Sequence, residues 1–218
     1  MHRDGGPAAQ RDYLLSSLEE DEVMLDARLR GEDFGCTPVE PAEGAALRFL
    51  ATSGRARSVV EVGTGAGVSG LWLMRGMAPD GVLTSIDIEP EHQRAARLCW
   101  LGAGQPSSRL RLINGRALDV LPRLTDGAYD LVFIDAVFVE YPRYLEEAVR
   151  LLRPGGVVAL SGALPDDTPL HLSGHPDNLA VREVQRVCEE SDELVVLPTP
   201  MGPGLLVAAK TLGQPTPR

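Results

Sequence analysis

The sequence is poor in lysine and carries an excess of acidic residues. Lys210 is the only lysine among 218 residues, so arginine supplies the other positive charges. Asp and Glu number 31 against 21 Lys and Arg, which leaves a formal net charge of −10. Such a surface repels a phosphate backbone, and no run of Lys or Arg offers a local basic patch. We therefore expect no nucleic acid partner.

Cysteines are few, and long apolar runs are absent. Cys36, Cys99 and Cys188 are scattered, odd in number and without metal-ligand spacing, which predicts reduced thiols and no cysteine metal site. No apolar segment reaches the length of a membrane span, and the first residues lack the apolar stretch of a secretory signal. We expect a cytoplasmic protein with no membrane partner.

Apolar, strand-like segments alternate with helical patterns through the middle of the chain. The predicted strands are Ser58–Val62, Val82–Asp87, Leu110–Ile113, Leu131–Asp135 and Val157–Ser161. The predicted helices between them are Val68–Met77, Pro90–Leu101, Ala117–Arg123 and Tyr141–Leu152. Continuous apolar strands that alternate with helices predict an α/β fold, a parallel sheet covered on both faces. Pro154-Gly155-Gly156 predicts a tight turn before the fifth strand.

The two ends of the chain add further elements. Before the first strand we expect an amphipathic helix from Arg11 to Arg30, stopped by Gly31, and a second helix from Pro41 to Ser53. After the fifth strand we expect a loop over residues 162–176, and then the elements Asn178–Glu190 (helix), Leu194–Leu197 (strand) and Leu205–Ala209 (strand). Residues 1–218 thus predict one domain with a helical segment at 11–53 and flexible ends at 1–10 and 213–218.

A glycine-rich loop follows the first predicted strand. Gly63, Gly65 and Gly67 let the backbone approach a ligand closely, and the helix that follows offers free N–H groups to negative oxygens. A dinucleotide fingerprint needs a third glycine at position 68, which is Val68. The pattern acid-x-Gly-x-Gly-x-Gly, with Glu61 as the acid, instead resembles motif I of class I S-adenosylmethionine (SAM) methyltransferases. A dinucleotide site and a turn without a ligand are the alternatives that the motif alone leaves open.

Further motifs extend this resemblance over residues 11–210. They are the segment Val39–Gly44, the glycine loop Glu61–Ser69, Ser85-Ile86-Asp87-Ile88-Glu89-Pro90-Glu91, Asp130-Leu131-Val132-Phe133-Ile134-Asp135-Ala136 and Leu152-Arg153-Pro154-Gly155-Gly156. Together they resemble the catechol and caffeoyl-CoA O-methyltransferases, also called O-methyltransferase family 3. The resemblance implies a Rossmann-like, mostly parallel sheet of seven strands with an antiparallel last strand. It also implies SAM as cofactor, a small-molecule acceptor and, in many relatives, a homodimer.

The resemblance assigns cofactor roles to particular residues. It implies that Asp87 takes the ribose hydroxyls, that Ile88 lies against the adenine, and that Asp135 lies over the methyl-transfer position, where it orients or deprotonates the acceptor. The remaining positions implied for cofactor binding are Val39, Glu61, Gly63, Thr64, Gly65, Ser69, Arg116 and Ala117. Arg116 stands where many relatives have an acid next to the adenine amino group, which either loosens adenine recognition or leaves it to backbone groups near Ala117.

The sequence departs from the family at the metal site. In the family, the position of Asp135 is the first of three metal ligands, and Asp-Ala-Asp-Lys continues with a second acid and a lysine base. Here Val137 and Phe138 take those two places, and Ser161-Gly162 replaces the Asp-Asn pair that ends the fifth strand. One carboxylate and one hydroxyl are a weak ligand set for a hard divalent cation. We expect no metal at this position.

Three interpretations remain open. The first is an O-methyltransferase that works without a metal, with Asp135, His171 or His175 as the base, because methyl transfer needs mainly alignment and a deprotonated acceptor. The second is a changed, more apolar or aromatic acceptor, given Val137, Phe138 and Tyr141. The third is a non-catalytic SAM-binding relative with an interaction or regulatory role. We expect the first, with both histidines more simply explained as exposed loop residues.

Overall fold

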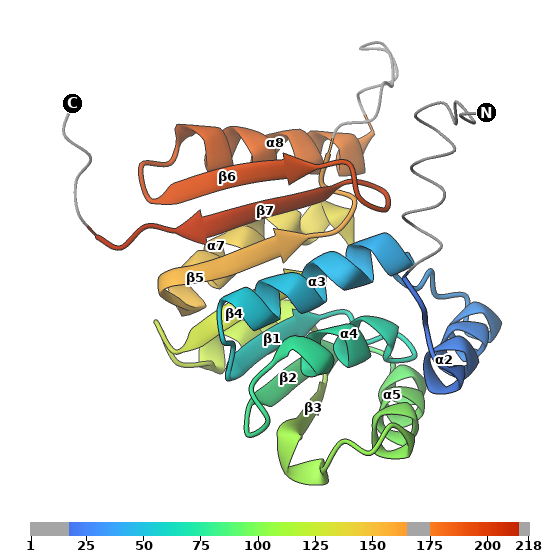
Figure 1. Ribbon diagram of the computed structural model, residues 1–218. Coiled ribbons are helices and arrows are strands. Elements are labelled where there is room, and N and C mark those ends of the chain that lie inside the picture. The colour runs from blue at the N-terminus through green and yellow to red at the C-terminus, as the bar shows by residue number, and fades with distance from the viewer. Residues whose placement is uncertain (1–17, 165–174, 214–218) are drawn as a thin grey trace, which may run out of the picture.

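The computed structural model describes residues 18–164 and 175–213, and they form one seven-stranded sheet with helices on both faces (Figure 1). The strand order is β3-β2-β1-β4-β5-β7-β6. Strands β1 to β5 pair in parallel, and β7 is antiparallel to both of its neighbours. The strands are β1 Ser58–Val62, β2 Val82–Asp87, β3 Leu110–Asn114, β4 Tyr129–Ile134, β5 Leu152–Leu160, β6 Leu194–Thr199 and β7 Leu205–Lys210. The expected Rossmann-like sheet with an antiparallel last strand is confirmed.

Two apolar clusters separate the helices into two layers. One cluster joins the sheet to the helices in front of it in Figure 1, α2 Glu22–Asp33, α3 Pro41–Ser53, α4 Val68–Gly76 and α5 Pro90–Gly102. The other cluster joins the sheet to α6 Ala117–Val120, α7 Tyr141–Leu151 and α8 Pro176–Glu190. Figure 1 shows α7 and α8 behind the strands. Short 3-10 turns lie at η1 Ser107–Arg109, η2 Leu121–Arg123 and η3 Phe138–Glu140. Strands β1, β2 and β4 are buried nearly throughout because helices cover both of their faces, whereas the edge strand β3 carries the exposed Arg111.

Two helix boundaries differ from the prediction. The helix expected over 11–30 begins, among the described residues, at Glu22, where the Asp21 carboxylate accepts a hydrogen bond from the Met24 N–H at 3.0 Å. It continues through Gly31 to Asp33, so Gly31 does not stop it. A Cβ at Gly31 would lie 2.9 Å from Pro38 Cγ, so the glycine serves close packing rather than termination. The helix predicted over Ala117–Arg123 is α-helical for one turn and then tightens into η2.

The predicted turn at Pro154-Gly155-Gly156 is wrong, because these residues lie inside β5. The pairing of β5 with β4 shifts register between Tyr129 and Leu131, and Gly155 has a φ of +76°. An irregularity of this kind lets a strand carry proline and a left-handed glycine without breaking. Helix α8 starts at Pro176, two residues before the predicted start at Asn178. Proline is favoured in the first turn of a helix.

The strand order reverses direction at β1. The chain leaves β1 for β2 and β3 on one side and returns to β4 and β5 on the other. At such a point the crossover loops diverge and open a crevice at the carboxyl ends of the strands, which is where α/β sheets bind ligands. Among the described residues, no helix has the length and apolarity needed to cross a membrane.

Candidate cofactor and acceptor site

A cavity of about 680 Å³ opens at the carboxyl ends of β1, β2 and β4. Every residue predicted to bind the cofactor lines it except Glu61; these are Val39, Gly63, Thr64, Gly65, Ser69, Asp87, Ile88, Arg116, Ala117 and Asp135. Segments far apart in the sequence therefore meet at one site. The cavity also touches residues that the sequence did not single out, among them Cys36, His92, Glu140 and Tyr144.

The glycine loop at the floor of this cavity needs its glycines. Gly63 has a φ of +94°, and a Cβ on it would collide with the carbonyl oxygen of Asp135. Gly67 has a φ of +97° and caps α4, where its carbonyl accepts a hydrogen bond from Trp100 Nε1 at 2.8 Å. Both positions combine left-handed backbone with the absence of room for a side chain. The loop is thus held between β4 and α5.

Asp87 at the end of β2 organises the loop from the opposite side. Its Oδ2 accepts hydrogen bonds from the Thr64 N–H at 2.9 Å and the Gly65 N–H at 3.1 Å, and its Oδ1 accepts one from the Glu89 N–H at 2.8 Å. A carboxylate with this many donors is held in one orientation at the cavity wall. Carboxylate oxygens have further lone pairs that suit a pair of vicinal hydroxyls, as in a ribose.

Cys36 and His92 extend this polar edge and were missed by the sequence reasoning. Cys36 Sγ lies 3.3 Å from His92 Nε2, and His92 Nδ1 lies 3.3 Å from Asp87 Oδ2. The Phe34 ring lies 5.8 Å from the His92 ring, centroid to centroid. Burial and the charges of Asp87 and Asp135 raise the pKa of the Cys36 thiol. A signal for His92 was available, since it lies in the first turn of the helix that follows Asp87.

Glu61 lies one layer beneath the cavity. Its side chain is fully buried, and its carboxyl accepts hydrogen bonds from the Ser69 hydroxyl at 2.7 Å and from the Ser85 hydroxyl. Burial raises the pKa of Glu61 to about 8, partly offset by these two hydroxyls. Through the hydrogen bond from Ser69, Glu61 fixes the orientation of the Ser69 hydroxyl, and Ser69 lines the cavity.

The rim of the cavity carries a second polar group from α7 and η3. Arg116 Nη2 lies 3.0 Å from Glu140 Oε1, and the Tyr144 hydroxyl donates to the same carboxylate. Arg116 is thereby turned toward Glu140, while the neighbouring Ala117 lines the cavity. Ile88 also lines the cavity and is 59% exposed, so an apolar face is available to a flat ring.

Asp135 and Ser161 stand side by side where β4 and β5 end. The register pairs Ile134 with Leu160, and the Ser161 N–H donates to the Ile134 carbonyl at 2.9 Å. Neighbouring strands lie about 4.8 Å apart, which sets the spacing of the two residues. Burial raises the pKa of Asp135 to about 6. Asp135 therefore places at the cavity wall a carboxyl whose pKa is closer to neutral pH than that of an ordinary aspartate.

The residues at these strand ends do not fit a divalent metal. Asp135 supplies one carboxylate and Ser161 one hydroxyl, whereas Val137, Phe138 and Gly162 supply no side-chain oxygen. A Cβ at Gly162 would lie 2.8 Å from the Phe138 ring, so even an Asn at this position would displace that ring. Within residues 18–164 and 175–213, no three His, Cys, Asp or Glu side chains gather as metal ligands would.

Of the two loop histidines, the structure describes His175, which does not line the cavity. His175 is exposed at the N-cap of α8, where its Nδ1 accepts a hydrogen bond from the Asp177 N–H at 3.4 Å. It lines a separate hollow of about 310 Å³ together with Phe138, Gly162 and Pro203. His171 lies outside the described residues. A capping role accounts for His175.

This fold and this cavity define a Rossmann-like protein that holds a nucleoside-containing cofactor on a glycine loop. Comparison with known proteins makes the assignment narrower. The family model described as O-methyltransferase matches residues 18–211, and the chain belongs to this family.

Individual relatives agree with the family. A protein of Mycolicibacterium vanbaalenii with the provisional name O-methyltransferase is 51% identical over 199 residues, 89% of this chain and 86% of that protein. A crystal structure from Corynebacterium glutamicum is similar with a TM-score of 0.88 and 31% identity, covering 95% of this chain and 98% of the other. The O-methyltransferase TomG of Streptomyces achromogenes, involved in tomaymycin synthesis and solved in complex with SAM, is similar with a TM-score of 0.80 and 29% identity over 93% and 96% of the two chains.

Proposed function

We propose that this protein transfers the methyl group of SAM to a hydroxyl oxygen of a small-molecule acceptor, and that it does so without a divalent metal at the strand-end position. The observation that carries the proposal is the cavity in which Asp87, the glycine loop and Asp135 meet. Bound SAM would supply an electrophilic methyl group on a sulfonium. The protein has to hold both reactants in line and receive one proton.

The residues present fit SAM. Asp87 would accept hydrogen bonds from the two ribose hydroxyls, Ile88 would cover one face of the adenine, and Ser69 at the start of α4 would meet the carboxylate. Because Gly63 has no Cβ, the glycine loop can lie directly against the Asp135 carbonyl and form the floor of the cavity. Asp135 then lies at the far end of the cavity, next to the acceptor.

A metal-free reaction is supported by the chemistry of the donor set. A hard cation requires several oxygen ligands, and the matching positions provide one carboxylate and one hydroxyl. Val137 gives the cavity an apolar wall at one of these positions, and Phe138 lines the neighbouring hollow. An aromatic alcohol suits such a wall.

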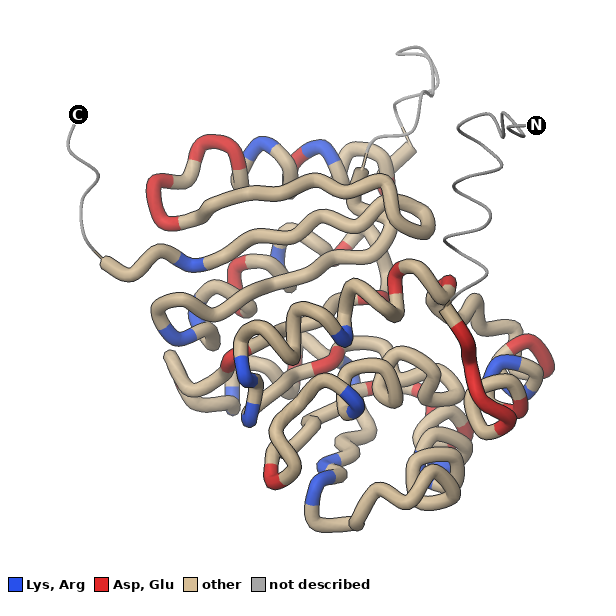
Figure 2. The backbone as a smooth tube through the Cα atoms, viewed as in Figure 1, with Lys and Arg blue, Asp and Glu red and all other residues tan. Residues whose placement is uncertain are grey.

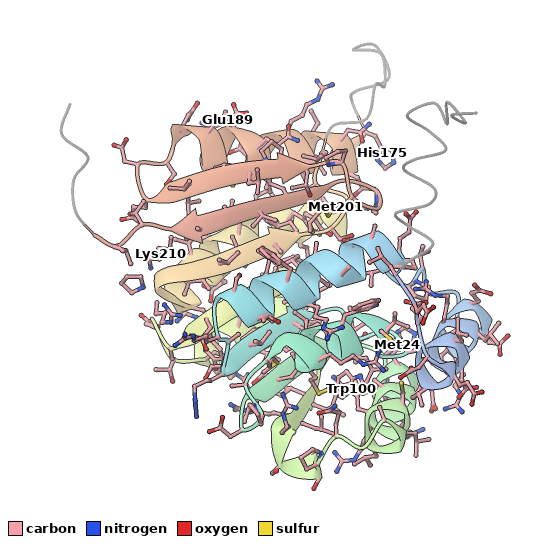
Figure 3. The ribbon with its side chains drawn as sticks, viewed as in Figure 1. Met24, Trp100, His175, Glu189, Met201 and Lys210 are labelled. Carbon is pink, nitrogen blue, oxygen red and sulfur yellow. The ribbon has the colours of Figure 1, made fainter. Side chains whose placement is uncertain are left out.

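A lysine base is excluded by position. The only lysine, Lys210, ends β7, and because β7 is antiparallel its last residues lie at the opposite end of the sheet from the cavity. Figure 3 shows Lys210 at one end of the sheet and Met201 and His175 at the other. Its Nζ also donates to the carbonyls of Val149 and Leu152, at 2.7 and 3.1 Å. The proton must therefore go to another group.

We further propose that the whole chain acts as one cytoplasmic domain and pairs as a homodimer, with no nucleic acid or membrane partner. Figure 2 shows arginines and acids interspersed over the face in view, with acids gathered on and before α2, which supports the absence of a nucleic acid site. Leu25 and Leu29 of α2 are about half exposed or more and offer apolar area to a second subunit. Sedimentation of the purified protein tests the dimer.

Thermal unfolding with added ligands tests the proposed function. SAM and S-adenosylhomocysteine, each at about 100 times its Kd, should stabilise the protein by roughly 2.7 kcal/mol, which is about 5–11 °C for a domain of this size. NAD should give no shift, and Mg²⁺ should add nothing to the shift with SAM. A protein that melts at the same temperature with and without both sulfur compounds would contradict the proposal. Binding of SAM without turnover of any phenol or catechol would favour the non-catalytic alternative.

A further inference from the structure

Three side chains at the edge of the cavity are joined by hydrogen bonds, although they come from three separate segments. Cys36 lies in the connection between α2 and α3, Asp87 ends β2, and His92 is the third residue of α5. All three line the cavity. Cys36 Sγ lies 3.3 Å from His92 Nε2, and His92 Nδ1 lies 3.3 Å from Asp87 Oδ2. Neither Cys36 nor His92 has a role in the proposed contacts with SAM.

The chemistry of the three groups sets the direction of both hydrogen bonds. An ionised carboxylate only accepts, so the proton between His92 and Asp87 belongs to His92 Nδ1. A neutral imidazole with its proton on Nδ1 presents Nε2 as an acceptor, and the Cys36 thiol is the donor that faces it. Burial and the charges of Asp87 and Asp135 raise the pKa of this thiol, which keeps it protonated. The hydrogen bonds therefore run from Cys36 through His92 to Asp87.

The backbone around Cys36 is itself fixed, so the thiol is presented at a defined place. The Cys36 N–H donates to the Gly31 carbonyl at 2.8 Å, and Arg28 Nη2 donates to the Val39 carbonyl at 2.8 Å. A Cβ built at Gly65 would lie 3.9 Å from Cys36 Sγ, which places the thiol against the glycine loop. This part of the cavity wall is thus tied to α2 by its backbone and to α5 through the Cys36 thiol.

His92 completes a set of four donors around the Asp87 carboxylate. Among the described residues, it is the one side chain that donates to this carboxylate, and the N–H groups of Thr64, Gly65 and Glu89 are backbone donors. Thr64 and Gly65 share Oδ2 with His92, whereas Oδ1 receives only the Glu89 N–H. Three donors converging on one oxygen oppose rotation of the carboxylate. Oδ1 keeps the greater capacity for a ligand hydroxyl.

We propose that His92 is a positioning residue of the cofactor site, which holds the Asp87 carboxylate in the orientation that receives a ribose hydroxyl, and that Cys36 holds the His92 ring for this purpose. The inference rests on the proposed function and deepens it, since it concerns how the ribose of SAM is recognised. His92 donates to the carboxylate, so it acts through Asp87. Loss of this donor should weaken recognition of the ribose without altering the methyl-transfer step.

Ligands with an altered ribose measure this role directly. The probes are S-adenosylhomocysteine and its 2′-deoxy and 3′-deoxy analogues, and calorimetry gives each Kd. With the wild type, at least one deoxy analogue should bind about tenfold or more weakly, the usual cost of a lost hydrogen bond to a charged group. With His92→Phe, this ratio should fall to about threefold or less, because the carboxylate is free to turn. Phenylalanine keeps a ring beside Phe34, whose centroid lies 5.8 Å from that of His92.

Two further variants separate positioning from a structural role. Asparagine carries an amide nitrogen near the place of the imidazole Nδ1, so His92→Asn should restore most of the preference for the intact ribose. Cys36→Ala should reduce that preference by a smaller factor, since it leaves the Nδ1 donor in place. With catechol as the acceptor, His92→Phe should raise KM for SAM and leave kcat within about twofold, because a lost binding contact away from the reacting atoms affects substrate and transition state alike.

Arg94→Gln is the matched control, because Arg94 is exposed two positions further along α5 and does not line the cavity. It should change neither the ligand preference nor KM for SAM. An equal preference for the intact ribose in the wild type and in His92→Phe would overturn the proposal, as would a His92→Asn protein that behaves like His92→Phe. Equal binding of all three ligands by the wild type would also overturn it. A wild type that binds none of the three would instead count against the proposed function itself.

Discussion

Gly63 is the residue at which the loop after β1 passes closest to the end of β4. Its φ of +94° lies in the left-handed region, and any Cβ would meet the Asp135 carbonyl oxygen. Gly63→Ala should therefore displace the loop or Asp135. Backbone strain should lower the free energy of unfolding by about 1–3 kcal/mol. The stabilisation by S-adenosylhomocysteine in a thermal melt should disappear with it.

Gly102→Ala is the matched control for this substitution. Gly102 ends α5 with no atom within 4 Å of a built Cβ, so alanine should be neutral or stabilising by up to about 1 kcal/mol. A Gly63→Ala protein that binds S-adenosylhomocysteine as well as the control would show that the loop tolerates a side chain.

The residues that meet at the cavity could be predicted where a motif fixes both the residue type and its distance from a strand end. Gly63, Asp87 and Asp135 follow strand ends at fixed spacing, and the structure brings them to one cavity. Cys36 reaches the same cavity from a segment without periodicity, so no spacing could place it. The burial of Glu43 was detectable in principle, since it lies four residues before the buried Leu47 and so on the buried face of α3. The close approach of Gly202 to the Glu43 carboxyl could not be predicted, because it joins segments far apart in the sequence.

At the scale of elements, α5 supports the glycine loop through a single hydrogen bond. Trp100 is fully buried, and its Nε1 donates to the Gly67 carbonyl at 2.8 Å. Trp100→Phe should cost about 0.5–1.5 kcal/mol, because the Gly67 carbonyl loses one of its two donors and keeps only the Leu71 N–H at 3.1 Å. Affinity for S-adenosylhomocysteine, measured by calorimetry, should fall together with the melting temperature. The substitution changes no residue of the glycine loop itself.

Leu98→Ala provides the comparison on the outer side of the same helix. Leu98 is 64% exposed, so its truncation should change the free energy of unfolding by no more than about 0.5 kcal/mol. Unchanged cofactor affinity in Trp100→Phe would mean that α5 does not hold the loop.

The elements were largely predictable because apolar period and glycine punctuation agree over most of the chain. The errors fall where tertiary packing outweighs a local signal. Gly31 normally indicates the end of a helix, but close contact with Pro38 keeps it within α2. Pro154-Gly155-Gly156 indicates a turn, yet pairing with β4 holds these residues in an irregular strand. Local sequence encodes neither of those partners.

For the whole molecule, buried acids should make stability fall as pH rises through neutrality. The folded protein raises the pKa of Glu61 to about 8 and that of Glu43 to about 7, above their unfolded values near 4.5. The folded state therefore binds more protons than the unfolded state between about pH 4.5 and 8, and the free energy of unfolding falls over that window. Melting temperatures measured from pH 5 to pH 9 should decline.

Glu61→Gln should flatten this decline, because the amide has no proton to lose. Above pH 8 the variant should be at least as stable as the wild type, and a gain of about 1 kcal/mol would raise the melting temperature by roughly 2–4 °C. Identical pH profiles for the variant and the wild type would show that Glu61 does not titrate in this range.

The contact between Gly202 and Glu43 joins positions separated by most of the chain. Closing so long a loop costs entropy that later contacts must repay, so pairings of this kind form late in folding. On the ribosome, all the residues that line the cavity have been synthesised before β6 and β7 emerge. The enclosure of Glu43 needs the final hairpin, so this contact is among the last that a nascent chain can make.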